Sequence, residues 1–264
     1  GVSFGAMPTH GAGTTYKRMR AGMSGEGGVF DQWITNPILG DTAEDLVPVV
    51  ANASGPLELF PAGAYGDDWL RVRWIDAQGQ EQMEVLDVQR AICDPTCWWR
   101  VVNPEWVNPA KQRRQRASFE ATRRRLCVAA TFHTRLAPAR LLENSHALYG
   151  DDSKQMTWGN VTWLCERPIP SSANPDPCTW SLVSDDAAGT IRVRSGDGEF
   201  ELKLQAPSDA GDGTVPAERS GAKAPVDGCI WKQAGYAHQE VYQVDQALSA
   251  TLYAMIRMDQ KLHP

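Results

Sequence analysis

The residues in this sequence best suited to chemistry are one aspartate and one histidine near its end. Asp212 lies in Gly211-Asp212-Gly213-Thr214-Val215-Pro216, where a glycine on each side permits a tight turn with unusual backbone angles. Such a turn can direct a single carboxylate sideways at a neighbouring group. Taken alone, the segment is also consistent with an ordinary surface turn.

His238 ends the segment Gly235-Tyr236-Ala237-His238, between a predicted short strand at 228–234 and a predicted long helix at 239–258. A histidine at the carboxyl end of a strand faces the mouth of an open α/β sheet, where ligands bind. A surface histidine or a helix-capping histidine is the alternative interpretation.

The order of these two residues along the chain adds information. In α/β-hydrolases a serine nucleophile comes first, an acid second and a histidine third, and Asp212 followed by His238 fits the last two. The carboxylate would hold the imidazole in one tautomer and stabilise its charged form. The imidazole would remove the proton of the serine and then protonate the leaving alcohol.

The elements that must position these residues follow from the hydrophobic periodicity. A short buried strand is predicted over 1–7, ended by Pro8, and Thr14 or Thr15 caps a short helix after it. Further predicted elements are helices at 42–53 and 118–136, and strands at 191–194 and 200–204 joined by a hairpin turn at 195–198. Together these elements predict an α/β fold.

The middle of the chain, roughly 66–205, holds most of the tryptophans and is interrupted by prolines. It is predicted to be a large insertion on a core fold, or a cap. Its tryptophans are either core or lid residues, or amphipathic rings at a lipid interface. The segment Cys97-Trp98-Trp99-Arg100 is the candidate for such a lipid contact.

Composition excludes some functions. The formal net charge of −6 argues against nucleic acid as the main partner, because phosphate binding requires a basic surface. No run of 18 apolar residues occurs, so no transmembrane segment is predicted. The spacing of the six cysteines matches no zinc pattern, and neither a metal nor a cofactor is expected. Cys93 and Cys97 flank a turn that would allow a disulfide in an oxidising compartment.

With its acid and histidine segments, the sequence resembles the ends of lipases related to lecithin:cholesterol acyltransferase and to the inositol-deacylating hydrolases. Residues 5–22, GAMPTHGAGTTYKRMRAG, are similar to the strand and loop that follow the nucleophile helix in bacterial type VI secretion lipase effectors. Residues 55–61, GPLELFP, and 65–70, YGDDWL, also resemble that group. The resemblance covers about 1–75 and 205–264 and is looser between them.

The resemblance implies an α/β-hydrolase fold whose N-terminal strands are missing. Core segments would lie at 1–75 and 206–264, with an insertion or cap at 76–205. It also implies a serine esterase, a lipase or phospholipase acting on lipid carboxylic esters, with Asp212 as the acid and His238 as the base. The protein would be a bacterial antibacterial effector, exported to the periplasm or membrane surface of a target cell and bound by a cognate immunity protein.

The same resemblance places the nucleophile and the oxyanion-hole loop upstream of this chain, so the missing N-terminal part is an expected partner. The segment Gly1-Val2-Ser3-Phe4-Gly5 has the letters of a nucleophile elbow, but an elbow needs a strand before its serine and a helix after it. Ser3 is therefore a poor candidate for the nucleophile. His10, Thr9 and Tyr236 are the candidates for the substrate side of the site.

Two other functions remain open. The chain is also consistent with a catalytically silent binding protein, for example one recognised by an immunity protein, or with an unrelated α+β binding module in which Asp212 and His238 never meet. A parallel sheet that lacks strands exposes an unpaired edge and part of its apolar face. We therefore expect the chain alone to be poorly soluble and to associate with itself or with its missing part.

Overall fold

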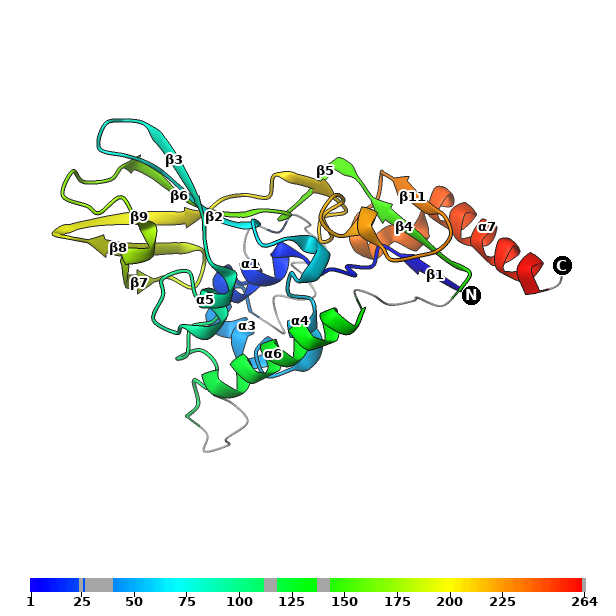
Figure 1. Cartoon of the computed structure of the whole chain (residues 1–264), viewed down its shortest axis with the longest axis horizontal. Coiled ribbons are helices and arrows are strands. Elements are labelled where there is room, and N and C mark those ends of the chain that lie inside the picture. The colour runs from blue at the N-terminus through cyan, green and yellow to red at the C-terminus, as the bar shows by residue number, and fades with distance from the viewer. Residues whose placement is uncertain (24–25, 27–39, 112–117, 137–142, 263–264) are drawn as a thin grey trace.

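The computed structural model describes residues 1–23, 26, 40–111, 118–136 and 143–262 of the chain. The molecule is elongated: a large sheet occupies one end, and a small sheet with the C-terminal helix occupies the other (Figure 1). Both chain termini lie at the end with the small sheet. Within the described ranges, no helix combines the length and the apolar character that crossing a membrane would require.

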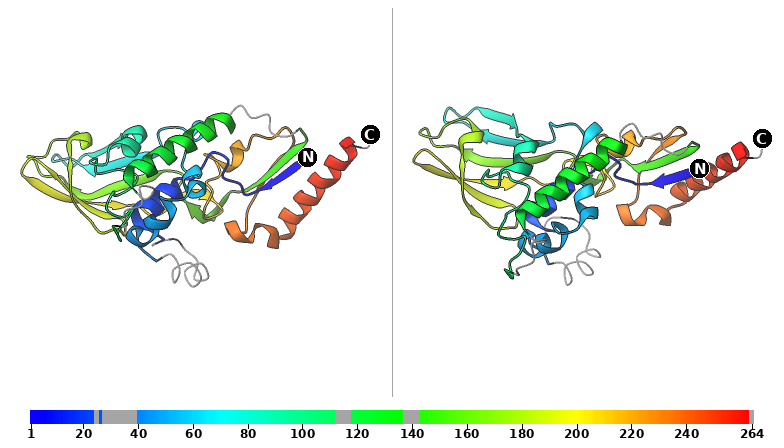
Figure 2. Two further views of the ribbon diagram at one scale, coloured as in Figure 1. Left: turned by 90° about the horizontal axis from the view of Figure 1, so that it is seen from below. Right: turned by 60° about the horizontal axis from the view of Figure 1, so that its bottom comes forward.

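The small sheet is made of three parallel strands from distant parts of the chain. These are β1 (Val2–Gly5), β4 (Ser145–Gly150) and β11 (Ile230–Gln233), with β4 in the centre. Helix α7 (Asp245–Leu262) packs against all three strands, and its buried residues are alanines. Figure 2 shows the course of this helix beside the small sheet from two further sides. Because the strands are parallel, their carboxyl ends meet at one edge of the sheet.

The large sheet is mostly antiparallel, in the order β3-β2-β6-β9-β8-β7, and only its β2–β6 pair is parallel. Its strands are β2 (Leu70–Ile75), β3 (Glu81–Val85), β6 (Val161–Pro168), β7 (Ser181–Asp185), β8 (Thr190–Ser195) and β9 (Gly198–Leu204). Between the sheets lies an antiparallel pair, β5 (Asp152–Thr157) and β10 (Asp209–Gly211).

The remaining helices gather on one side of the molecule, below the large sheet and its connection to the small one in the view of Figure 1. Helix α3 begins where the sequence predicts, because the Thr42 hydroxyl accepts from the Asp45 amide and the Asp45 carboxylate accepts in return from the Thr42 amide. The helices are α1 (Gly13–Ala21), α3 (Ala43–Val50), α4 (Ser54–Glu58), α5 (Val88–Cys93) and α6 (Phe119–Leu136), with short 3₁₀ turns η1 (Gly63–Tyr65), η2 (Pro177–Thr179), η3 (Gly221–Lys223) and η4 (His238–Gln243).

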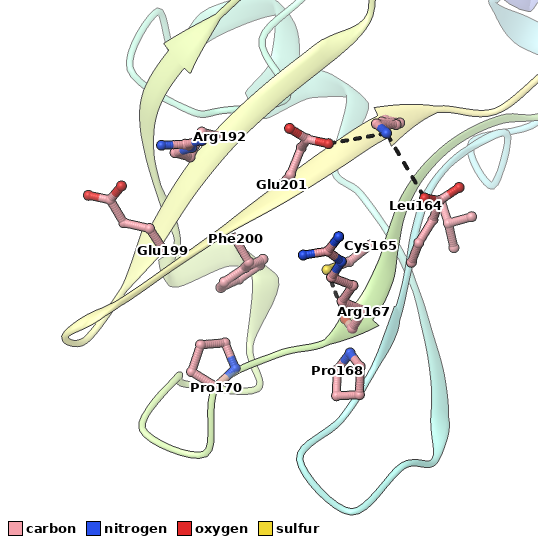
Figure 3. Close-up of a pocket in the computed structure, with 11 residues that line it drawn as sticks. Leu164, Cys165, Arg167, Pro168, Pro170, Arg192, Glu199, Phe200 and Glu201 are labelled. Atoms are coloured by element: carbon pink, nitrogen blue, oxygen red, sulfur yellow. Dashed lines mark hydrogen bonds and ion pairs between the residues drawn. The ribbon is translucent and has the colours of Figure 1, made fainter.

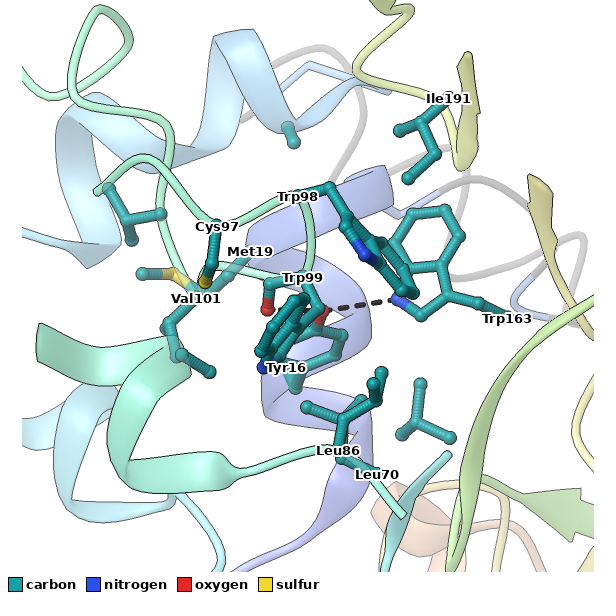
Figure 4. Close-up of a cluster of buried hydrophobic side chains, with 14 of the residues drawn as sticks. Tyr16, Met19, Leu70, Leu86, Cys97, Trp98, Trp99, Val101, Trp163 and Ile191 are labelled. Atoms are coloured by element: carbon teal, nitrogen blue, oxygen red, sulfur yellow. Dashed lines mark hydrogen bonds between the residues drawn. The ribbon is translucent and has the colours of Figure 1, made fainter. Parts of the chain in front are cut away.

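The main hydrophobic core is built around tryptophans and corrects one expectation. Trp98 and Trp99 are both 0% exposed, so the predicted lipid contact at these two residues is wrong. The Trp98 ring lies 5.3 Å from that of Trp99 and stacks on Trp180 at 6.0 Å. Tyr16 of α1 donates its hydroxyl to the Trp99 carbonyl and accepts from the indole of Trp163 (Figure 4).

Among the other expectations about the fold, the hairpin is confirmed, whereas the disulfide and the extent of the last helix are corrected. The hairpin predicted between 191 and 204 is confirmed as β8 and β9. All six cysteines are free thiols, and Cys97 is buried, so the disulfide between Cys93 and Cys97 is not formed. The predicted helix at 239–258 is divided into the 3₁₀ turn η4 and α7. Strands of the small sheet and of the large sheet alternate along the chain. The expected insertion at 76–205 contains β4, which is the central strand of the small sheet.

Candidate active site

The acid of the site lies on a closed turn directly after β10. Gly211 and Pro216 bridge the base of this turn, and Gly213 inside it has a φ of +88°, which favours glycine. The Asp212 Oδ1 atom accepts hydrogen bonds from the amides of Thr214, at 3.0 Å, and Val215, at 2.7 Å. The turn therefore fixes the carboxylate in one orientation while burying its side chain completely.

The histidine reaches the same place from the carboxyl end of β11, in the small sheet. His238 follows β11 after a short loop and begins η4. Its Nδ1 atom lies 2.9 Å from Asp212 Oδ2, and its backbone amide donates to the Asp212 carbonyl at 2.8 Å. In the neutral ring, a proton on Nδ1 leaves the lone pair of Nε2 free to accept one. The His238 side chain is 32% exposed, so the pair joins a buried acid to an accessible base.

Neighbouring elements hold the acid turn in place. A Cβ atom on Gly150, at the carboxyl end of β4, would lie 2.8 Å from the Asp212 Cβ, so only glycine fits there without a shift. The hydroxyl of Thr157, at the end of β5, donates to the Thr214 carbonyl at 3.0 Å and contacts the Thr14 hydroxyl of α1 at 3.1 Å. The turn is thus supported by β4, β5 and α1 together.

A cavity of about 280 Å³ opens beside the pair. No serine or cysteine is present among the described residues that line it, which are Arg18, Glu26, Lys154, Gln155, Met156, Trp158, Pro207, Asp212, Gly213, Thr214, Ala237, His238 and Gln239. A larger cavity of about 530 Å³ lies on the β6, β9 and β8 strands of the large sheet (Figure 3). Neither Asp212 nor His238 lines that larger cavity.

The structure brings Asp212 and His238 together but keeps the other predicted site residues out of this cavity. The His10 ring is buried, with its Nε2 atom 2.9 Å from the Lys223 carbonyl, and burial lowers the pKa of His10. Thr9 is buried beside it. Tyr236 packs in the apolar cluster under α7, and burial raises the pKa of its hydroxyl. Ser3 is paired with His146 in the small sheet, and its hydroxyl contacts no partner in the described chain.

Several residues around the cavity were not predicted from the sequence to belong to the site. Arg18 comes from α1, and Lys154, Gln155 and Met156 come from β5. Arg18 lies in the 5–22 segment that resembles lipase effectors, but that resemblance gave it no role in the site. Lys154, Gln155 and Met156 stand in no motif, and the distance along the chain between them and Asp212 hides their proximity.

A comparison with solved structures finds a similar fold. The chain is similar in structure to a chain in the crystal structure of the Tle4–Tli4 complex, with a TM-score of 0.72 and 25% sequence identity. The match covers 98% of this chain and 55% of that chain, so this chain spans about half of the solved chain. No family model matches the sequence, and no curated protein matches it significantly.

Proposed function

We propose that this chain supplies the acid and the base of a serine esterase of the α/β-hydrolase type, acting on lipid carboxylic esters. The hydrogen bond between the buried Asp212 carboxylate and His238 Nδ1 is the observation that carries the proposal. A carboxylate fixed by two backbone amides and bonded to an accessible imidazole is the base half of a Ser-His-Asp triad.

In the proposed reaction His238 Nε2 accepts the proton of a serine hydroxyl as that hydroxyl attacks the ester carbonyl. Asp212 stabilises the imidazolium that forms, and the imidazolium then protonates the departing alcohol. Water repeats the sequence on the acyl-serine and releases the carboxylic acid. The hydrogen bonds from the Thr214 and Val215 amides hold the Asp212 carboxylate in position against the ring throughout.

The nucleophile is proposed to be a serine outside this sequence, upstream of Gly1. Two observations support this position. No described residue that lines the cavity is a serine, and the chain spans 55% of the solved chain that it resembles. The pair also lies at the carboxyl edge of three parallel strands, where active sites of open α/β sheets form. We propose that the core consists of 206–264, β4 and the part of 1–75 that precedes β2, and that the large sheet, which includes β2, is the insertion.

The biological setting follows from two likenesses. Residues 5–22 are similar to type VI secretion lipase effectors, and the solved chain belongs to a complex of two components, Tle4 and Tli4. We therefore propose an exported bacterial effector that an immunity protein binds.

Labelling with a fluorophosphonate probe, followed by peptide mass spectrometry, tests the proposal. This chain and a form extended upstream to the natural start of the protein are treated side by side, and the probe modifies activated serines only. Labelling of the longer form alone, on an upstream serine and lost in a His238→Ala variant, is the expected result. Labelling of Ser3, or labelling that persists in the variant, would contradict it.

A catalytically silent binding chain is the second candidate. The lack of a serine among the described cavity residues favours it, as does the likeness to a chain solved in a complex. The same experiment separates the two: a folded longer form that no probe modifies and that hydrolyses no ester would favour binding.

A further inference from the structure

The cavity of about 530 Å³ on the large sheet lies where two neighbouring strands, β6 and β9, separate (Figure 3). Among the described residues, the ladder between these strands contains only two residue pairs, Trp163 with Leu204 and Leu164 with Lys203. Beyond these pairs β9 still pairs with β8, and β6 still pairs with β2, as far as the end of each strand. The cavity therefore lies between two strand edges that face each other without pairing.

The sequence explains why the ladder stops. Continued in the same register, it would place Glu166 directly opposite Glu201, and like charges in that position destabilise a sheet. Lys203 lies 3.2 Å from the Glu201 carboxylate and 4.0 Å from that of Glu166, so one ammonium group is shared by two carboxylates. Pro168, further along β6, has no amide to donate. These residues keep this end of the sheet open.

The open edge of β9 directs backbone groups into the cavity. The Gln205 amide donates to the Thr162 carbonyl of β6 at 2.9 Å, whereas the Leu204 amide donates to the opposite side, towards β8. Because backbone groups alternate in direction along a strand, those of Glu199 and Glu201 point to the same side as those of Gln205. The ladder with β6 ends before both glutamates, so in the described sheet these groups have no strand partner.

The side chains of the cavity indicate what kind of segment fits there. Each glutamate of the wall already contacts a basic side chain. Arg167 and Arg192 also line the cavity, and neither forms an ion pair with any residue that the structure describes. A guanidinium group binds a carboxylate through two parallel hydrogen bonds. These two arginines therefore favour an acidic side chain on the occupant.

We propose that an extended segment of a partner protein, bearing an acidic side chain, binds in this cavity as an added strand on the free edge of β9. Its backbone exchanges hydrogen bonds with Glu199 and Glu201, and its carboxylate contacts Arg192. Added strands derive affinity from main-chain hydrogen bonds and specificity from alternate side chains. The inference does not depend on the proposed esterase, because neither Asp212 nor His238 lines this cavity.

Fluorescence anisotropy tests binding on this chain as it stands. The probe is a fluorescein-labelled hexapeptide of alternating threonine and valine with one central aspartate, taken from an array in which the residues around the aspartate vary. One matched peptide carries lysine in place of the aspartate, and another carries N-methyl groups on the amides that face β9. We expect each matched peptide to bind about tenfold more weakly or less, because each loses a hydrogen-bonded contact.

Two variants of Glu201 separate the backbone from the side chain. Glu201→Pro removes the amide that faces the cavity but none that bonds to β8, and should weaken binding of the aspartate peptide about tenfold. Glu201→Gln keeps that amide, and should bind the peptide at least as tightly as the unaltered chain. Circular dichroism shows whether each variant is folded, and the N-methylated peptide tests the same hydrogen bonds without any substitution.

Arg192→Gln should also weaken the aspartate peptide about tenfold and leave the lysine peptide unaffected. Its control is Arg257→Gln, an exposed arginine on α7 at the other end of the molecule, which should bind as the unaltered chain does. Hydrogen exchange should show that the bound peptide protects the amides of Glu199 and Glu201. Binding of no peptide in the array, equal binding of the N-methylated peptide, or protection confined to other strands would overturn the inference.

Discussion

Both oxygens of the Asp212 carboxylate have hydrogen-bond partners within the protein itself. One oxygen accepts from two backbone amides, and the other faces His238 Nδ1. Asp212→Asn would put an amide donor against the backbone amides or against Nδ1, and would favour the wrong tautomer. In the longer form that carries the proposed esterase, we expect a fall in kcat of about 10³- to 10⁴-fold with the protein still folded. Ester hydrolysis assays measure this, and a fall below tenfold would remove Asp212 from the triad.

Gly150 offers a second test at the scale of one residue. The Cβ of Gly150→Ala would meet the Asp212 Cβ at 2.8 Å and its Cα at 3.3 Å, so the acid turn must move. We expect a loss of about 1–3 kcal/mol in stability and a fall in activity of tenfold or more. Gly55→Ala is the matched control, because its new methyl group meets open space. Thermal melts and hydrolysis assays should separate the two variants.

The buried His10 should make the folding stability depend on pH. Burial lowers the pKa of His10 in the folded chain below its ordinary value of 6.5, so the unfolded chain binds more protons between these two values. The free energy of unfolding should therefore be unaffected by His10 above about pH 6.5, and should decrease as the pH falls below that value. In melts between pH 5 and 8, His10→Gln should show a shallower decline. Some decline remains, because burial also lowers the pKa of His146. An unchanged slope would refute the assignment.

At the scale of the elements, the loop that carries Trp98 is a core segment. Trp98→Ala removes a ring that packs on Trp99, Trp163 and Trp180, and should cost about 3–5 kcal/mol. Leu252→Ala, on the exposed side of α7, should change stability by less than about 0.5 kcal/mol. Urea denaturation measures both changes. A stable Trp98→Ala variant that no longer binds vesicles would restore the lipid-contact interpretation.

Local patterns predicted the elements whose partners are near in sequence. The hairpin of β8 and β9 and the helix α6 follow from alternation and from helical spacing. The pairing of β4 with β1 and β11 joins segments far apart, and no local pattern contains it. The contact between Asp212 and His238 was predictable because both residues stand in glycine-containing turns in a known chain order. Lys154 and Gly150 were not, because only the tertiary fold brings them to Asp212.

At the scale of the whole molecule, α7 presents apolar residues to solvent. Its alanines face the small sheet, while Leu248, Leu252, Met255 and Ile256 are each about half exposed. Exposed apolar surface of this kind drives association. We expect sedimentation velocity to show oligomers of this chain that grow with concentration, and the double variant Leu252→Glu, Met255→Glu to shift it towards monomer. A chain that stays monomeric at high concentration would contradict this expectation.

The parallel small sheet also determines when Asp212 and His238 can meet during synthesis of the chain. Its first strand begins at Val2, but the central strand begins at Ser145 and the last at Ile230. At a synthesis rate of about 5–20 residues per second, the first strand waits on the order of ten seconds for its neighbour to leave the ribosome. His238 can meet Asp212 only after residue 238 has been made, more than 230 residues after β1 begins. A nascent chain that has not reached this residue therefore lacks the contact between Asp212 and His238.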